Sequence, residues 1–180
     1  MGAPKRNRKK FDKPKDIWNL ARINADNALI KEYGLKNMSE LWKVQSELSR
    51  IRGNVRLLLS GAAGTGNVEQ ALKNRLIKLG IIDKDTPLEK LLELSERSIL
   101  DRRLESVVYK RGMARSMKQS RQLITHGFIS INGRKLTVPG YLVKAEEEPK
   151  IGYYKPIDIV PAKHEEEKAE AGPSVEQAEN

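Results

Sequence analysis

The sequence predicts an α+β protein, with an all-helical N-terminal domain followed by a small domain of two helices and a short twisted antiparallel sheet. Two observations lead to this class. Apolar residues recur every three or four positions through much of the first hundred residues, which is typical of amphipathic helices. After residue 127 the period changes to two on both sides of Asn132-Gly133, a dipeptide typical of tight β-hairpins.

Composition excludes several classes of protein. The 180 residues include 34 Lys or Arg and 24 Asp or Glu, and the net charge of +10 favours a polyanionic partner. There is no cysteine, which excludes disulfides, cysteine-ligated zinc and thiol nucleophiles. Hydrophobic residues make up 38%, which suits a modest core better than a large enzyme. No apolar run is long enough for a signal peptide or a membrane span, so we expect a cytoplasmic protein without membrane contact.

The charge divides the chain into four parts. Residues 1–15 carry seven basic and one acidic residue and are expected to form an extended arm, or else a merely solubilising tail. Residues 16–102, with 14 basic and 12 acidic residues, form the helical domain. Residues 103–161 carry 11 basic and five acidic residues and form the α+β domain. Residues 162–180, with two basic and six acidic residues, are expected to be a disordered acidic tail.

Four helices are predicted in the helical domain. The first spans 16–33 and ends at Gly34, and the third spans 67–79. A capping box at Thr86-Pro-Leu-Glu89 begins the fourth. The second helix begins at an N-cap, Ser39, and carries one apolar stripe: Leu41, Val44, Leu48, Ile51, Val55 and Leu58.

Two features of the helical domain resemble ligand sites but are better explained otherwise. The glycines of the segment 61–66 could cradle a phosphate, yet no Gly-Lys-Ser/Thr follows and no strand precedes, so we expect a connector between helices. Trp18, Tyr33 and Trp42 accompany apolar positions, so we expect them to pack between helices rather than to stack on bases.

The α+β domain begins with a helix predicted over 98–110. A second helix follows from a capping box at Ser116-Met-Lys-Gln119 and ends at Gly127. Its N-terminus, beside Arg115, offers backbone amides and partial positive charge to a phosphate. One side of this helix should be buried, and the other should present Lys118, Arg121, Gln122 and Thr125.

The β-hairpin is predicted from strands at 128–131 and 135–138. Shorter strands at 141–143 and 151–153 complete the sheet, and Tyr153 and Tyr154 are expected to close its core. Arg134 and Lys135 then lie beside the hairpin tip, next to the basic helix. Such a concave positive surface suits recognition of phosphates and of RNA shape better than base reading.

The order and spacing of several motifs in this domain closely resemble the RNA-binding domain named after small-subunit ribosomal protein four. These motifs are Arg102-Arg-Leu-Glu105, Gly112-Met-Ala-Arg-Ser116, Arg121-Gln-Leu-Ile124, His126-Gly-Phe-Ile129, Ile131-Asn-Gly133 and Pro139-Gly-Tyr141. The helical domain resembles the archaeal and eukaryotic branch of the same ribosomal protein family through Glu32-Tyr-Gly-Leu-Lys-Asn37, Leu41-Trp-Lys-Val-Gln45 and Leu48-Ser-Arg-Ile-Arg52. The sequence departs from the usual pattern at Glu105, Ser120 and Gly140, where Asp, Ala and Ser are usual.

The resemblance implies a structural constituent of the small ribosomal subunit, not an enzyme, that binds the 5′ domain of the small-subunit (16S) rRNA early in assembly. It further implies a place beside ribosomal protein five, near where the messenger RNA enters, and an influence on translational accuracy. It implies no cofactor and no metal. The RNA-facing positions implied by the resemblance are Arg103, Arg115, Ser116, Lys118, Gln119, Arg121, Gln122, His126, Asn132, Arg134 and Lys135. The basic arm adds Lys5, Arg6, Arg8, Lys9 and Lys10 as expected RNA contacts.

Two other functions fit part of the sequence, and the role of His126 has several interpretations. An RNA-modifying enzyme that carries this module would need a catalytic domain, which the first hundred residues do not supply. A nonspecific DNA-compacting protein fits the charge but leaves the hairpin module unexplained. His126 could bind RNA, complement a helix C-terminus or be a plain surface residue; a catalytic role is not expected, because the only other histidine is His164.

Overall fold

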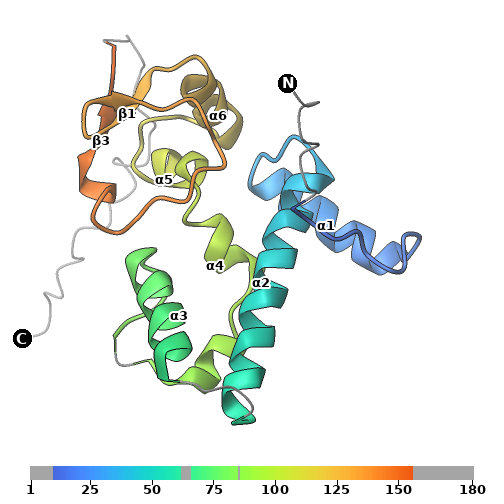
Figure 1. Ribbon diagram of the computed structural model, residues 1–180. Helices are drawn as coiled ribbons and strands as arrows, with labels where there is room; N and C mark the ends of the chain where they lie inside the picture. The colour runs from blue at the N-terminus through green and yellow to red at the C-terminus, as the bar shows by residue number, and fades with distance from the viewer. Residues whose placement is uncertain (1–9, 62–65, 85, 156–180) are drawn as a thin grey trace, which may run out of the picture.

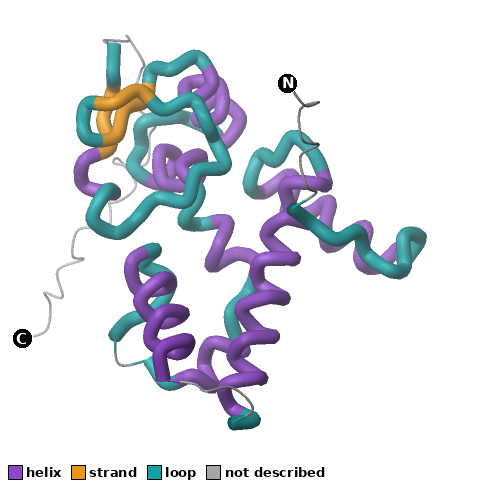
Figure 2. Tube along the Cα trace, viewed as in Figure 1, coloured by secondary structure: helices purple, strands orange, loops and turns teal. Residues whose placement is uncertain are grey.

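The computed structural model describes residues 10–61, 66–84 and 86–155. The predicted acidic tail and the arm residues Lys5, Arg6, Arg8 and Lys9 lie outside these ranges. The described chain forms two lobes, and its helices and small antiparallel sheet confirm the α+β class (Figures 1 and 2). The helical lobe has a core that runs from Tyr33 to Leu100, and the C-terminal lobe has a second core that runs from Leu104 to Ile151.

The helical lobe is arranged around one long helix, α2 (Met38–Leu59). Its predicted apolar stripe is confirmed, since every member from Leu41 to Leu58 is buried. The stripe contacts the other helical elements of the lobe: α1 (Leu20–Glu32), α3 (Gly66–Lys78), the 3-10 helix η1 (Leu88–Leu92) and α4 (Glu96–Leu100). The N-cap of α2 is Asn37 rather than the predicted Ser39. Each described helix is too short or too polar to cross a membrane.

Two helix starts in this lobe differ from the prediction. Helix α1 begins at Leu20 instead of residue 16, because the Asn19 side chain caps it by accepting a hydrogen bond from the Arg22 amide. The predicted capping box at Thr86 does not form. Pro87 has an extended backbone, with ψ of 154°, and precedes a five-residue 3-10 helix that has no side-chain cap.

The aromatic residues of this lobe have different environments. Tyr33 is buried, as predicted, and donates a hydrogen bond to Asp101 at 3.0 Å. Trp42 is half-buried and contacts the Phe11 ring, with 5.9 Å between ring centroids. The packing prediction is wrong for Trp18, which is 89% exposed.

The helix predicted over 98–110 is two helices, α4 and α5 (Leu104–Lys110). Arg103 separates them in an extended conformation, with ψ of 144°, and forms an isolated β-bridge to Leu142. The Leu104 amide donates to the Tyr141 carbonyl at 2.8 Å, and the Val143 amide donates to the Arg102 carbonyl at 2.9 Å. This backbone pairing interrupts the helix. The segment 141–143, predicted as a strand, takes part in this pairing. It forms only the isolated bridge at Leu142 and no regular strand.

The sheet of the C-terminal lobe has the order β2-β1-β3 and is antiparallel throughout. Its strands are β1 (Ile129–Ile131), β2 (Arg134–Lys135) and β3 (Ile151–Tyr153). Asn132 and Gly133 both have positive φ, at 52° and 74°, which confirms the predicted type of turn. Strand β2 is shorter than the predicted 135–138. Tyr153 and Tyr154 are 43% and 49% exposed, so the expectation that they close the core is wrong.

Candidate RNA-binding surface

Helix α6 (Met117–Thr125) has one buried and one exposed side, as predicted. Ser120, Leu123 and Ile124 are buried, and Ser120 donates a hydrogen bond to the Glu105 carbonyl at 2.7 Å. Lys118 and Gln122 on the other side are exposed.

The predicted capping of α6 forms with one change of partner. Ser116 is the N-cap, and its hydroxyl accepts a hydrogen bond from the Gln119 amide. The Gln119 side chain reaches back to the Arg115 amide, with 2.7 Å between the oxygen and the nitrogen, rather than to the Ser116 amide. This exchange fixes the helix N-terminus, whose cap residue Ser116 is exposed at the surface.

The hairpin lies against the other end of α6. Lys135 extends across Gly127, so closely that a Cβ atom at Gly127 would overlap its side chain. Gly127 has φ of +76°, a conformation that favours glycine and lets the chain leave the helix directly into β1. We call the exposed residues brought together in this way the hairpin face: Arg115, Ser116, Lys118, Gln122, His126, Asn132, Arg134 and Lys135.

Three cations of the hairpin face have no acidic partner. Within the described ranges, Lys118, Arg134 and Lys135 form no salt bridge and no side-chain hydrogen bond. Their charge is therefore available to an external anion. His126 is exposed at the C-cap of α6, where a protonated ring would also complement the helix dipole.

Two predicted RNA-facing arginines occupy a different place. Arg103 is 5% exposed, and its guanidinium lies 2.7 Å from a carboxylate oxygen of Glu40 in α2. Arg121 lies 2.6 Å from Glu40 and 3.3 Å from Glu105. We call Glu40, Arg103, Glu105 and Arg121 the inter-lobe cluster, because Glu40 belongs to the helical lobe and the others to the C-terminal lobe. These arginines hold the lobes together instead of presenting free donors.

The pKa values of the two carboxylates in this cluster are shifted in opposite directions. Burial raises the pKa of Glu105 to about 7, although the charges of Arg121 and Arg103 oppose it. Burial also raises the pKa of Glu40, but hydrogen bonds from Arg121 and Arg103 outweigh it and hold that pKa below the ordinary value. One oxygen of Glu105, Oε1, is buried without a hydrogen-bond partner. Gly34 lies at this contact, since a Cβ there would be 2.9 Å from the Met117 Cβ.

A groove lined in part by the inter-lobe cluster brings Lys10, which the sequence predicts to contact RNA, together with basic residues that were not predicted to do so. Its volume is about 780 Å³, and Lys10, Lys43, Arg50 and Arg75 are among the residues that line it. Lys43 and Arg50 lie off the apolar stripe of α2, and this position was the feature of the sequence that could have indicated their exposure. What the sequence could not show is that α2, α3 and the arm residue Lys10 meet at one groove.

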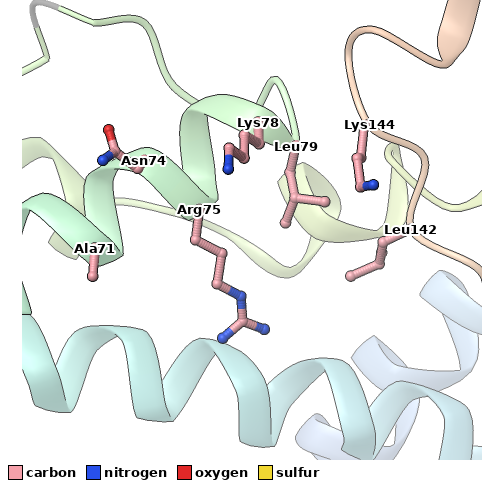
Figure 3. A pocket seen from close by; sticks show the side chains of 7 residues that line it. All are labelled: Ala71, Asn74, Arg75, Lys78, Leu79, Leu142 and Lys144. Atoms are coloured by element: carbon pink, nitrogen blue, oxygen red, sulfur yellow. The ribbon is translucent and has the colours of Figure 1, made fainter.

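A second hollow, of about 520 Å³, lies between α3 and the loop that follows the hairpin. Figure 3 shows Arg75 and Lys78 on the α3 side and Lys144 on the loop side. Arg75 is paired with Glu47, and Lys144 with Glu147, so both positive charges are partly compensated. The hollow is open and basic, and it holds no arrangement of groups that suggests catalysis. Among the described residues, no three His, Asp or Glu side chains come together as a possible metal site.

Comparison with known proteins identifies both lobes. Residues 102–149 match the S4 domain family. The chain is 44% identical over 155 residues to small ribosomal subunit protein uS4 of Methanothermobacter thermautotrophicus, which covers 86% of this chain and 91% of the relative. The uS4 protein of Caldivirga maquilingensis is 42% identical and covers 98% of this chain and 100% of the relative. That of Saccharolobus solfataricus is 41% identical and covers 86% of each. The resemblance seen in the sequence is thus confirmed, and the chain belongs to the small ribosomal subunit protein uS4 family.

Proposed function

We propose that this protein is a structural component of the small ribosomal subunit in the cytoplasm and that it binds small-subunit rRNA. Its family consists of ribosomal proteins rather than enzymes. The RNA-binding part of the proposal rests on the hairpin face. There Lys118, near the exposed start of α6, and Arg134 and Lys135, at the other end of this helix, are exposed and have no acidic partner among the described residues.

Binding would rest mainly on phosphates. Each lysine or arginine that pairs with a phosphate releases condensed counterions, which supplies affinity without sequence specificity. Ser116, Gln122, Asn132 and His126 add hydrogen-bonding groups that suit phosphates and ribose 2′-hydroxyls. Selectivity would then come from an RNA shape that places phosphates along α6 and the hairpin tip together. Arg103 and Arg121 would act indirectly, by fixing the orientation of α6 against the helical lobe.

The finer role rests on the family resemblance. It supports binding to the 5′ domain of the rRNA as an early step that nucleates assembly of the subunit body. It also supports a position beside ribosomal protein five, near where the messenger RNA enters, with an effect on translational accuracy. The basic arm, including the exposed Lys10 at the inter-lobe groove, would extend the rRNA contact beyond the hairpin face.

The test is filter binding of the purified protein to the 5′ domain of its own small-subunit rRNA, with transfer RNA and duplex DNA as competitors. If about six to eight phosphates are neutralised, log affinity should fall with log salt at a slope of roughly −4 to −7. Substituting Lys118, Arg134 and Lys135 together with alanine should weaken binding and reduce the steepness of that slope by about 2 to 3. The melting temperature should change little, because these side chains form no ion pair or hydrogen bond within the described residues and only Lys135 packs on the fold, over Gly127.

The matched control is Lys90→Ala, which removes an exposed lysine from η1 in the helical lobe. It should bind rRNA as the wild type does. A flat salt dependence, or equal affinity for duplex DNA and rRNA, would contradict the proposal. The second result would favour a nonspecific basic protein.

A further inference from the structure

The turn that precedes α1 exposes a large aromatic side chain that the hairpin face does not use. Trp18 is 89% exposed, the highest value among the large hydrophobic residues described, and its neighbours Ile17 and Leu20 are 56% and 74% exposed. In Figure 1 the blue segment before α1 extends to the side of the helical lobe opposite the C-terminal lobe. Neither core therefore covers Trp18.

This exposure belongs to a segment that is held in place. The Arg22 guanidinium donates to the Ile17 carbonyl at 3.0 Å and to the Asp26 carboxylate at 2.7 Å. Asp26 is 3% exposed and also accepts a hydrogen bond from Gln45 of α2 at 3.2 Å. The Asn19 cap fixes the start of the helix. The Trp18 ring is thus presented on a turn that is anchored to α2 through a buried carboxylate.

A second anchor fixes the chain just before this turn. Phe11 contacts Trp42 of α2, and the Asp12 amide donates to the Ser46 hydroxyl at 3.0 Å. Residues 11 and 12 are therefore tied to α2. The stretch between the two anchors, residues 13–16, therefore spans a fixed distance, and Trp18 directly follows the anchored Ile17.

Unpaired cations accompany the indole along this stretch. Lys10, Lys13 and Lys15 are exposed and form no ion pair within the described residues, and four further basic residues precede them in the sequence. An apolar protein partner seated on Trp18 would have to desolvate these lysines, whereas RNA would offer a phosphate to each. An exposed aromatic ring that follows a run of cations is typical of surfaces that stack on the bases of unpaired RNA.

We propose that Trp18 stacks on an unpaired base of the small-subunit rRNA, with Lys13 and Lys15 at the neighbouring phosphates. The inference rests on the proposed rRNA binding and adds a second contact, on the side of the helical lobe away from the C-terminal lobe. It would account for an aromatic ring that no part of the described chain covers. It would also give the basic arm a defined point at which to leave the protein surface.

The experiment uses the full chain with Trp42→Phe, which makes Trp18 the only tryptophan. Titration with the 5′ domain of the chain's own rRNA should quench the Trp18 fluorescence as the complex saturates. Trp18→Ala should weaken rRNA binding by about 5- to 150-fold, the equivalent of one lost stacking contact, while Trp18→Phe should retain most of the affinity. The control Leu57→Ala removes an exposed apolar side chain from the C-terminal end of α2 and should leave binding unchanged.

Three results would overturn the inference, and they have different meanings. Unchanged fluorescence and wild-type affinity of Trp18→Ala, with binding still lost in the Lys118, Arg134 and Lys135 triple variant, would remove the stacking contact but keep the proposed function. A fluorescence change that needs other proteins of the subunit would assign Trp18 to a protein partner. If the wild type fails to bind rRNA at all, both proposals fail.

Discussion

The inter-lobe cluster and the hairpin face contain the same kinds of basic residue but place them in opposite environments. Arg103 and Arg121 are paired with Glu40 and Glu105, and the Arg103 side chain is only 6% exposed. Lys118, three residues before Arg121, is exposed and has no ion-pair partner in the part of the chain that the structure describes. The comparison teaches that a basic residue in an RNA-binding motif is available to RNA only if no carboxylate from another part of the chain reaches it first.

The largest expected effect is on folding, from Arg103→Ala. It leaves Glu40 and Glu105 with one arginine between them in a buried site, and we expect a loss of about 3 kcal/mol in the free energy of unfolding. Urea denaturation measures it. Lys118→Ala, the control from the hairpin face, should stay within about 0.5 kcal/mol of the wild type. If Arg103→Ala has the same free energy of unfolding as the wild type but a lower rRNA affinity, Arg103 contacts RNA. The inter-lobe cluster and the hairpin face would then not differ in function.

The second effect concerns pH. The pKa of Glu105 is about 7 in the folded protein, against an ordinary value of 4.5, because burial disfavours the charged form. Between these values the unfolded chain ionises while the folded protein keeps its proton, so stability should fall as pH rises from about 4.5 to about 7 and then level off. Relative to Glu105→Gln, the wild type should lose up to about 3 kcal/mol across this window.

Urea denaturation of both proteins at several pH values would test this prediction. Glu40 has a lowered pKa, so its contribution is present above about pH 4.5 and is lost as pH falls below it. The two carboxylates therefore act in separate windows. Parallel stability curves for the wild type and Glu105→Gln would mean that Glu105 is already ionised and that its arginines outweigh its burial.

The smallest expected effect tests whether the start of α6 belongs to the RNA contact of the hairpin face. Ser116→Ala removes the N-cap of α6 and should cost about 1 kcal/mol of stability. Ser116→Asp keeps a capping oxygen but adds negative charge to the surface proposed to meet phosphates. We therefore expect urea denaturation close to the wild type and weaker rRNA binding in the filter assay. Normal rRNA affinity for Ser116→Asp would place the α6 N-terminus outside the contact.

What the sequence could predict was local in origin. The cap at Ser116, the turn at Asn132-Gly133 and the stripe of α2 each depend on residues within a few positions of one another, and all three are confirmed. The exposed side of α6 followed from the same periodicity. The fold class could therefore be predicted from local sequence patterns alone.

What the sequence could not predict depends on distant pairing. The helix over 98–110 was wrong because Arg103 pairs with Leu142, which lies on a distant loop. The burial of Arg103 depends on Glu40, 63 positions away. Trp18 looked like a core residue because its neighbours are apolar, yet nothing in the described chain packs over it. Motif resemblance identified the surface but could not separate the arginines that face outward from those that join the lobes.

The separation along the chain between Glu40 and its arginines also determines the order in which these partners are synthesised. Glu40 leaves the translating ribosome 63 residues before Arg103 and 81 before Arg121. At roughly 5 to 20 residues per second, about 4 to 16 s pass before both partners have been synthesised. During that interval the stripe of α2 already has α1 and Tyr33 to pack against, while Glu40 remains solvated. A newborn chain can therefore join its two lobes through Glu40 only after the whole helical lobe has been synthesised.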